Sequence, residues 1–173
     1  MIKAAFCDDD LSVLNELHVL MDNYRVERNQ EITYTAFHSP LELIAQIEKG
    51  MRFDILFLDV LMPGVNGIET AQEIREYDSA MKIIFLTSSA EYAVESYTVN
   101  AYFYQLKPIW PESFYRLMDS VLKECAQEQR RSLILRCKSG ITQISLDRLM
   151  YCEVQGRTLV FHMQNNELLE SVG

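Results

Sequence analysis

Short apolar runs alternate with amphipathic stretches through the first two thirds of the chain. The apolar runs predict five strands, at residues 2–7, 32–37, 54–58, 82–86 and 102–106. The third and fourth are almost entirely apolar, as expected of strands that are covered on both faces. Apolar residues spaced by three and four predict helices between the strands and a last helix that begins near Pro111. This alternation is typical of an α/β protein with a doubly wound, five-stranded parallel sheet.

The period of the apolar positions changes to two after residue 132. Four further short strands are predicted, at residues 133–137, 141–146, 150–154 and 159–163. They indicate a separate, small antiparallel β domain of about forty residues, which is marginal on its own. The expected organisation is therefore a domain at 1–122, a linker at 123–132 formed by the polar end of the last helix, and a partial domain at 133–173.

Composition and charge narrow the class of protein. The chain is 49% hydrophobic and 24% charged, which is typical of a globular protein and not of a disordered one. No segment approaches the roughly 18 to 20 apolar residues of a membrane span, and the N-terminus is unlike a signal peptide, so we expect a cytoplasmic protein without membrane contact.

Charge is unevenly spread along the chain. The net charge is −9, and residues 1–122 hold 9 Lys or Arg against 19 Asp or Glu. Only residues 123–173, with 7 basic and 6 acidic residues, could approach a polyanion without strong repulsion. That excess is too slight to indicate nucleic-acid binding by itself.

The four cysteines show no metal-binding or redox spacing. Cys7, Cys125, Cys137 and Cys152 lie in apolar runs without a C-x-x-C pattern. We therefore expect small buried residues and neither disulfides nor zinc ligands.

Reactive side chains gather where the predicted parallel strands end. The first strand is followed by Asp8-Asp9-Asp10, the third by Asp59, the fourth by Thr87-Ser88 and the fifth by Lys107-Pro108. In an open parallel sheet the ligand site lies beyond the carboxyl ends of the strands, so these side chains are expected to converge. Clustered carboxylates repel one another unless a cation joins them, and an oxygen-rich site of this kind suits Mg²⁺. The pattern predicts metal-assisted phosphoryl chemistry.

These positions resemble the receiver domain of two-component response regulators, the CheY-like family with a flavodoxin-like fold. The resemblance covers residues 1 to about 122 and includes the run from Phe57 to Gly64. It implies that Asp59 is the phosphoacceptor. Asp9 and Asp59 would bind Mg²⁺ directly together with the backbone carbonyl of Leu61, and Asp8 would act through water.

The resemblance also implies a signalling mechanism. Thr87 and Lys107 would bind the phosphoryl group, and Tyr104 would be the switch aromatic residue. The donor would be a histidine kinase, and the chain would catalyse its own phosphorylation and dephosphorylation without being an enzyme in the usual sense. Homodimerisation is expected through the fourth helix, the fifth strand and the fifth helix.

Other interpretations of the same residues remain open. Asp10 is expected to cap the helix that starts near Leu11, and an acidic triplet after a strand is often no more than a cap and a solvated turn. Tyr104 lies in an apolar run and could be a core residue. The D-x-D of residues 8–10 also occurs in haloacid dehalogenase-type phosphohydrolases, but the late acidic pair of that family is missing and Asp59 would have no role.

The tail resembles the beginning of a LytTR DNA-binding domain, over residues 133–140 and 144–153. That family reads DNA through loops between strands, which makes Arg157 in the 155–158 turn a candidate DNA contact, against an ordinary solvated turn. The chain holds about half of what that family needs, so we expect a truncated output domain that binds DNA only when complete. The alternative output is a phosphorylation-controlled protein-interaction module without DNA binding.

Overall fold

The computed structural model describes residues 1–137, 140–164 and 166–172. The chain divides into two compact units, Met1–Val121 and Leu122–Gly173. None of the helices in the described residues is both long enough and apolar enough to cross a membrane.

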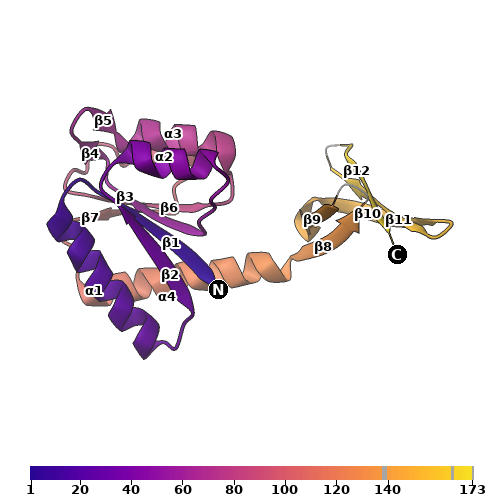
Figure 1. Cartoon of the computed structure of the whole chain (residues 1–173), viewed down its shortest axis with the longest axis horizontal. Helices are drawn as coiled ribbons and strands as arrows, with labels where there is room; N and C mark the ends of the chain where they lie inside the picture. Colours follow the sequence, from indigo (N-terminus) through magenta and orange to yellow (C-terminus); the bar gives the residue numbers. More distant parts are fainter. Residues whose placement is uncertain (138–139, 165, 173) are drawn as a thin grey trace. The chain divides into compact units, whose positions relative to one another are not determined.

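The first unit is a parallel sheet with helices on both faces (Figure 1). Its elements are β1 (Ile2–Cys7), α1 (Leu11–Glu27), β2 (Ile32–Phe37), α2 (Pro40–Glu48), β3 (Ile55–Leu58), β4 (Leu61–Met62), β5 (Val65–Asn66), α3 (Gly67–Tyr77), β6 (Lys82–Thr87), a 3₁₀ helix (Glu95–Val99), β7 (Phe103–Leu106) and the first part of α4 (Pro111–Arg130), within which the boundary between the units falls. The strand order is β2-β1-β3-β6-β7, and every neighbouring pair in this sheet is parallel. Helices α1 and α4 cover one face, and α2 and α3 cover the other. The predicted doubly wound α/β fold is confirmed.

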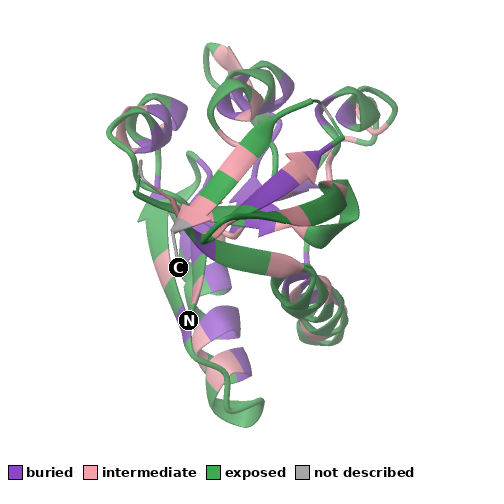
Figure 2. Ribbon diagram, turned by 90° about the vertical axis from the view of Figure 1, so that its right-hand side faces the viewer, coloured by how far each residue is buried: buried purple, intermediate pink, exposed green. Residues whose placement is uncertain are grey.

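Burial explains why the central strands are so apolar. All four residues of β3 are buried, and so are five of the six residues of β6, because helices cover both faces of these strands. The helices are buried along one side and exposed along the other, as the purple and green bands in Figure 2 show. In α4 the buried stripe includes Phe114, Met118 and Val121. This two-sided core holds the strand ends in fixed register.

The prediction of a fourth α-helix between β6 and β7 is wrong. Turns at residues 91–94 lead into the short 3₁₀ helix, which ends at Asn100 in the left-handed conformation with φ of 51°. The Ser96 and Thr98 hydroxyls donate to the carbonyls of Ala93 and Glu95, each at 2.6 Å. Such side-chain bonds compete with the α-helical hydrogen bonds of the backbone.

The second unit is an antiparallel sheet, as predicted. Its elements are β8 (Ser132–Cys137), β9 (Gly140–Ser145), a 3₁₀ helix (Leu146–Arg148), β10 (Leu149–Gln155), β11 (Thr158–Met163) and β12 (Leu168–Val172), in the order β10-β11-β12-β8-β9. Its small core consists of Leu135, Ile144, Phe161 and Met163. Strand β12 was not predicted, and the residues expected to form the linker are helical as far as Arg130.

The expectation that all four cysteines are buried is only partly correct. Cys7 and Cys125 are buried, Cys137 is half-buried, and Cys152 is exposed on β10. The apolar run around Cys152 does not form a buried face: β10 is an edge strand of its sheet, and Met150, Tyr151 and Val154 on it are exposed as well.

Candidate functional site

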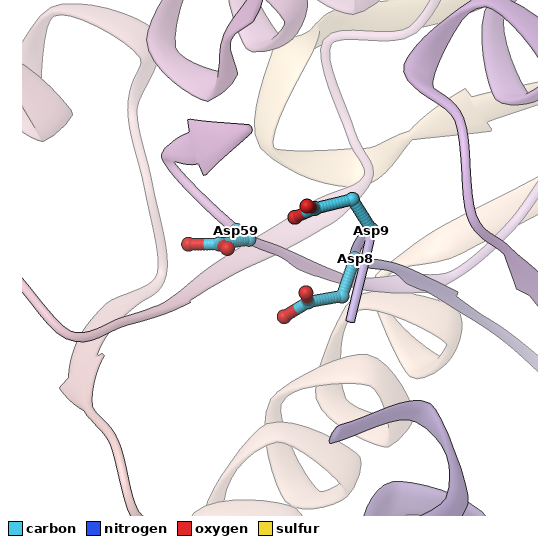
Figure 3. Close-up of side chains that lie close together, drawn as sticks. All are labelled: Asp8, Asp9 and Asp59. Carbon is cyan, nitrogen blue, oxygen red and sulfur yellow. The ribbon is translucent and has the colours of Figure 1, made fainter. Parts of the chain in front are cut away.

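Three carboxylates meet at the ends of two adjacent strands. Strands β1 and β3 pair directly, with Cys7 opposite Leu58, so the residues that follow them are neighbours. One carboxylate oxygen from each of Asp8, Asp9 and Asp59 lies within 4.8 Å of the others. The three side chains point to the same side of the sheet edge (Figure 3). Asp8 and Asp59 are buried and Asp9 is exposed, so the cluster is open to solvent on one side.

Lys107 reaches the same point from the end of β7. Its Nζ lies 2.7 Å from Asp8 Oδ2 and 3.2 Å from Asp59 Oδ2. Burial raises the pKa of Asp8, and the hydrogen bond from Lys107 offsets only part of that effect. Burial acts to lower the pKa of Lys107, but the hydrogen bond to Asp8 and the charges of Asp59 and Asp8 outweigh it, so the pKa is raised. The lysine therefore stays a cation between the two buried carboxylates.

The donor set fits a hard divalent cation. Clustered oxygen ligands, two of them buried, are what Mg²⁺ prefers, and the exposed side leaves room for water and for phosphate oxygens. Without added positive charge, three carboxylates this close destabilise one another, and a single lysine balances only part of that charge.

Backbone contacts fix the position of Asp59. Its amide donates to the Cys7 carbonyl at 3.0 Å, and its Oδ1 accepts from the Leu61 amide at 3.2 Å. The first residue of α3, Gly67, packs against the Asp59 backbone so closely that a Cβ there would lie 2.1 Å from the Asp59 carbonyl oxygen. The sequence pointed to this turn, but it did not reveal the reason for the glycine.

Asp10 is separate from the carboxylate cluster. Its Oδ1 accepts from the Ser12 amide at 2.9 Å and so caps α1, which confirms the predicted cap. Asp8 in turn accepts from the Asp10 amide at 2.9 Å. The acidic triplet therefore divides into two residues of the cluster and one helix cap.

Thr87 and Tyr104 both contact Ser89, a residue that the sequence did not single out. Thr87 ends β6, is fully buried, and accepts from the Ser89 amide at 3.5 Å. The Tyr104 hydroxyl donates to the Ser89 carbonyl, while its ring packs near Phe85. Thr87 and Tyr104 thus hold the backbone of Ser89 from its two sides, one at the amide and the other at the carbonyl.

Leu61 and Arg157 lie where the sequence placed them, and their roles stay predictions. Leu61 begins the two-stranded β4–β5 ribbon, two residues after Asp59. Arg157 is exposed in the turn between β10 and β11, after Gly156 with φ of 66°. An exposed hairpin turn fits both a DNA contact and an ordinary solvated turn.

Residues 5–119 match the family model of the response regulator receiver domain. The chain belongs to this family. Receiver domains of two-component systems bind Mg²⁺ through an acidic pocket and interact with histidine kinases, and Asp8, Asp9 and Asp59 form such a pocket here. The match also sets aside the haloacid dehalogenase alternative, because the D-x-D residues lie inside the matched range.

Curated relatives and solved structures agree with this assignment. The chain is 31% identical to the sensory transduction protein LytT of Oceanobacillus iheyensis over 68% of its own length and 51% of that protein. It is 25% identical to the transcriptional regulatory protein NatR of Bacillus subtilis over 91% of its own length and 66% of NatR. The chain thus spans about half to two thirds of these relatives. The response regulatory domain of mrkE from Klebsiella pneumoniae has a similar fold, with a TM-score of 0.65 at 23% identity over 73% of this chain and 99% of that one.

Proposed function

We propose that this receiver accepts a phosphoryl group on Asp59 from the phosphohistidine of a histidine kinase. The observation that carries the proposal is the convergence of Asp8, Asp9 and Lys107 on the Asp59 carboxylate. Asp59 is the member of this set that extends from the central strand of the sheet.

The residues of the site have separate roles in phosphoryl transfer. Asp59 attacks phosphorus in line, forming the P–O bond as the P–N bond to the kinase imidazole breaks. Lys107, already 3.2 Å from Asp59 Oδ2, pairs with a phosphoryl oxygen, and Thr87 donates its hydroxyl to another. Mg²⁺, held by Asp9, Asp59 and the Leu61 carbonyl and by Asp8 through water, would neutralise charge on the transferred group.

Labelling with acetyl phosphate tests the acceptor directly. We expect the wild type to gain one phosphoryl group in the presence of Mg²⁺, as seen by intact mass and by a phosphate-affinity gel, and to gain none with excess EDTA. Asp59→Asn should remain unlabelled, because the amide is not a nucleophile. Asp10→Asn is the matched control, since Asn also caps helices and Asp10 lies outside the cluster. Labelling of Asp59→Asn at the wild-type rate would refute the assignment.

An apolar surface near the site is the proposed binding surface for the kinase. A cavity of about 480 Å³ lies between α1 and the segment that follows Lys107, and it is lined by Asn15, Glu16, Val19, Leu20, Pro108, Ile109, Trp110 and Pro111. Trp110 is 65% exposed there. Exposed aromatic residues are typical anchors of protein interfaces. We therefore expect Trp110→Ala to slow phosphoryl transfer from the cognate kinase while labelling by acetyl phosphate is unchanged.

Phosphorylation would control dimerisation through the face that includes β7 and α4. In place of the expected fourth helix, the 3₁₀ segment borders this face. A hollow of about 430 Å³ on it is lined by Tyr102, Phe103, Gln105, Ser113, Arg116, Leu117 and Ser120. When Thr87 turns toward the phosphoryl group, it releases the Ser89 amide, and the contact of Tyr104 with Ser89 changes as a result. Sedimentation velocity with and without beryllium fluoride tests for the dimer.

The output we propose is transcriptional, through a LytTR-type domain that begins in the second unit. The name of NatR, a transcriptional regulatory protein aligned with 91% of this chain, favours this output over a protein-interaction module. DNA binding is expected only from a complete output domain. A gel shift of a chain extended past residue 173, compared with its Arg157→Ala variant, separates the two outputs.

A further inference from the structure

One arginine of the first unit donates to four backbone carbonyls that belong to two separate loops. Arg75 lies on α3, and its guanidinium is partly buried. Nε donates to the Val99 carbonyl at 2.8 Å and Nη2 to the Asn100 carbonyl at 3.1 Å. Nη1 donates to the carbonyls of Met81 at 2.7 Å and Asp78 at 3.2 Å. The side chain thus joins α3, the loop before β6 and the end of the 3₁₀ helix.

The two ends of residues 88–100, which we call the switching segment, are held by different means. At its start, Ser89 is held by the hydroxyl groups of Thr87 and Tyr104. These are the groups that phosphorylation is expected to redirect. At its end, Val99 is buried and both it and Asn100 are held by Arg75, which has no part in phosphoryl chemistry.

The guanidinium is well suited to act as a fixed anchor. Its planar fork presents five N–H donors in rigid geometry, so one side chain satisfies several carbonyls at once. Burial lowers the pKa of Arg75, although the neighbouring Asp78 charge acts in the opposite direction. Hydrogen bonds that involve a charged group are the stronger ones in proteins, so the end of the segment is held more firmly than the neutral contacts at Ser89 hold its start.

We propose that Arg75 is a positioning residue that anchors the end of the switching segment, so that phosphorylation moves residues 88–95 about a hinge at the start of the 3₁₀ helix, at Glu95. Asn100, whose left-handed backbone makes the bend into β7, lies on the anchored side of this hinge. The phosphorylation-dependent part of this inference rests on the proposed function, whereas the anchoring itself does not.

Hydrogen exchange of the full chain, measured by mass spectrometry with and without Mg²⁺ and beryllium fluoride, tests both parts. Without the mimic, Arg75→Gln should speed exchange in fragment 96–102 by roughly tenfold or more, because even one charge-assisted hydrogen bond is worth about that factor. Arg52→Gln is the matched control, since Arg52 donates to the carbonyls of Ile47 and Met51 at another turn. It should leave fragment 96–102 unchanged. If Arg75→Gln does not fold, Arg75→Lys replaces it, because a lysine keeps the charge but loses the fork.

The response to the mimic distinguishes an anchor from a simple stabilising contact. In the wild type, the mimic should alter exchange in residues 88–95 and leave 96–102 unchanged. In Arg75→Gln the alteration should extend through 96–102. A merely stabilising role would speed exchange by the same factor with and without the mimic, and that result would overturn the hinge. If fragment 96–102 of Arg75→Gln exchanges at the wild-type rate without the mimic, the anchor is overturned. If the mimic leaves hydrogen exchange unchanged throughout the wild type, including around Asp59, the proposed function and the hinge both fail. The samples without the mimic still decide whether Arg75 is an anchor.

Discussion

Replacing Gly67 with alanine is expected to disable the phosphoacceptor without touching any group that carries charge. Glycine is required at position 67 because there is no room for a Cβ, and not because of the backbone conformation. A Cβ would lie 2.1 Å from the Asp59 carbonyl oxygen, 2.7 Å from Val60 Cα and 2.9 Å from the Asp59 carbonyl carbon. All three atoms belong to backbone, which cannot move aside as a flexible side chain would.

The size of the effect follows from these distances. An ordinary carbon–oxygen contact is about 3.3 Å, so α3 and the Asp59 backbone must separate by about 1.2 Å. Overpacking of this kind costs about 1–3 kcal/mol of stability. A displacement of about 1 Å at a reacting group costs on the order of 10²-fold in rate. We therefore expect Gly67→Ala to fold less stably and to be labelled by acetyl phosphate about a hundredfold more slowly.

The assay pairs urea unfolding with the rate of acetyl phosphate labelling. Gly50→Ala is the matched control, because Gly50 has φ of 99° but a Cβ added there would meet no atom within 4 Å. That variant should lose about 1–2 kcal/mol from backbone strain alone and keep the wild-type labelling rate. Wild-type labelling of Gly67→Ala would refute the view that the α3 contact positions Asp59. An equal loss of labelling in Gly50→Ala would show that instability, and not position, is responsible.

Two further predictions concern stability and thiol chemistry. Hydrogen bonds from Arg28 and then Tyr24 lower the pKa of Asp119, so its carboxylate stabilises the fold above the unfolded pKa of about 3.8 and this contribution is lost as pH falls through the lower, folded value. Asp119→Asn should therefore cost up to about 1 kcal/mol of unfolding free energy in urea at pH 7. The difference from the wild type should shrink as pH falls below the unfolded pKa of about 3.8, and a difference that stays constant as pH falls further contradicts the ion pair. Burial raises the pKa of Cys7 to about 12, so at pH 8 only about one thiol in ten thousand is ionised there, and peptide mapping after iodoacetamide treatment of the native chain should find Cys152 modified and Cys7 protected.

The parallel core could be predicted because its signal is local. The apolar runs at β3 and β6 are short, uninterrupted and bounded by polar residues, so their positions were correct to within a residue at either end. The 3₁₀ segment could not be predicted in the same way. The Ser96 and Thr98 hydroxyls can bond to nearby carbonyls in several backbone conformations, and packing of Val99 into the core decides between them.

The candidate site was predictable only in its charged and hydroxyl-bearing members. Asp8, Asp59 and Lys107 follow strands, and the geometry of a parallel sheet brings strand ends together without further information. Gly67 and Ser89 were missed as contributors because their roles depend on contacts with backbone atoms. Contacts of that kind depend on the distance between loops, which no pattern of residue types records.

The position of β7 in the sheet separates the stiff and the pliable parts of the receiver. Strand β3, which precedes Asp59, is paired on both sides, whereas β7 is an edge strand paired with β6 alone. Tyr104 lies on that edge strand, and Lys107 directly follows it. The acceptor and its neighbouring acids thus follow strands that are paired on both sides, whereas Lys107 and Tyr104 depend on a strand that is hydrogen-bonded on one side only. The effect of phosphorylation can therefore spread through β7 without displacing the carboxylates of the site.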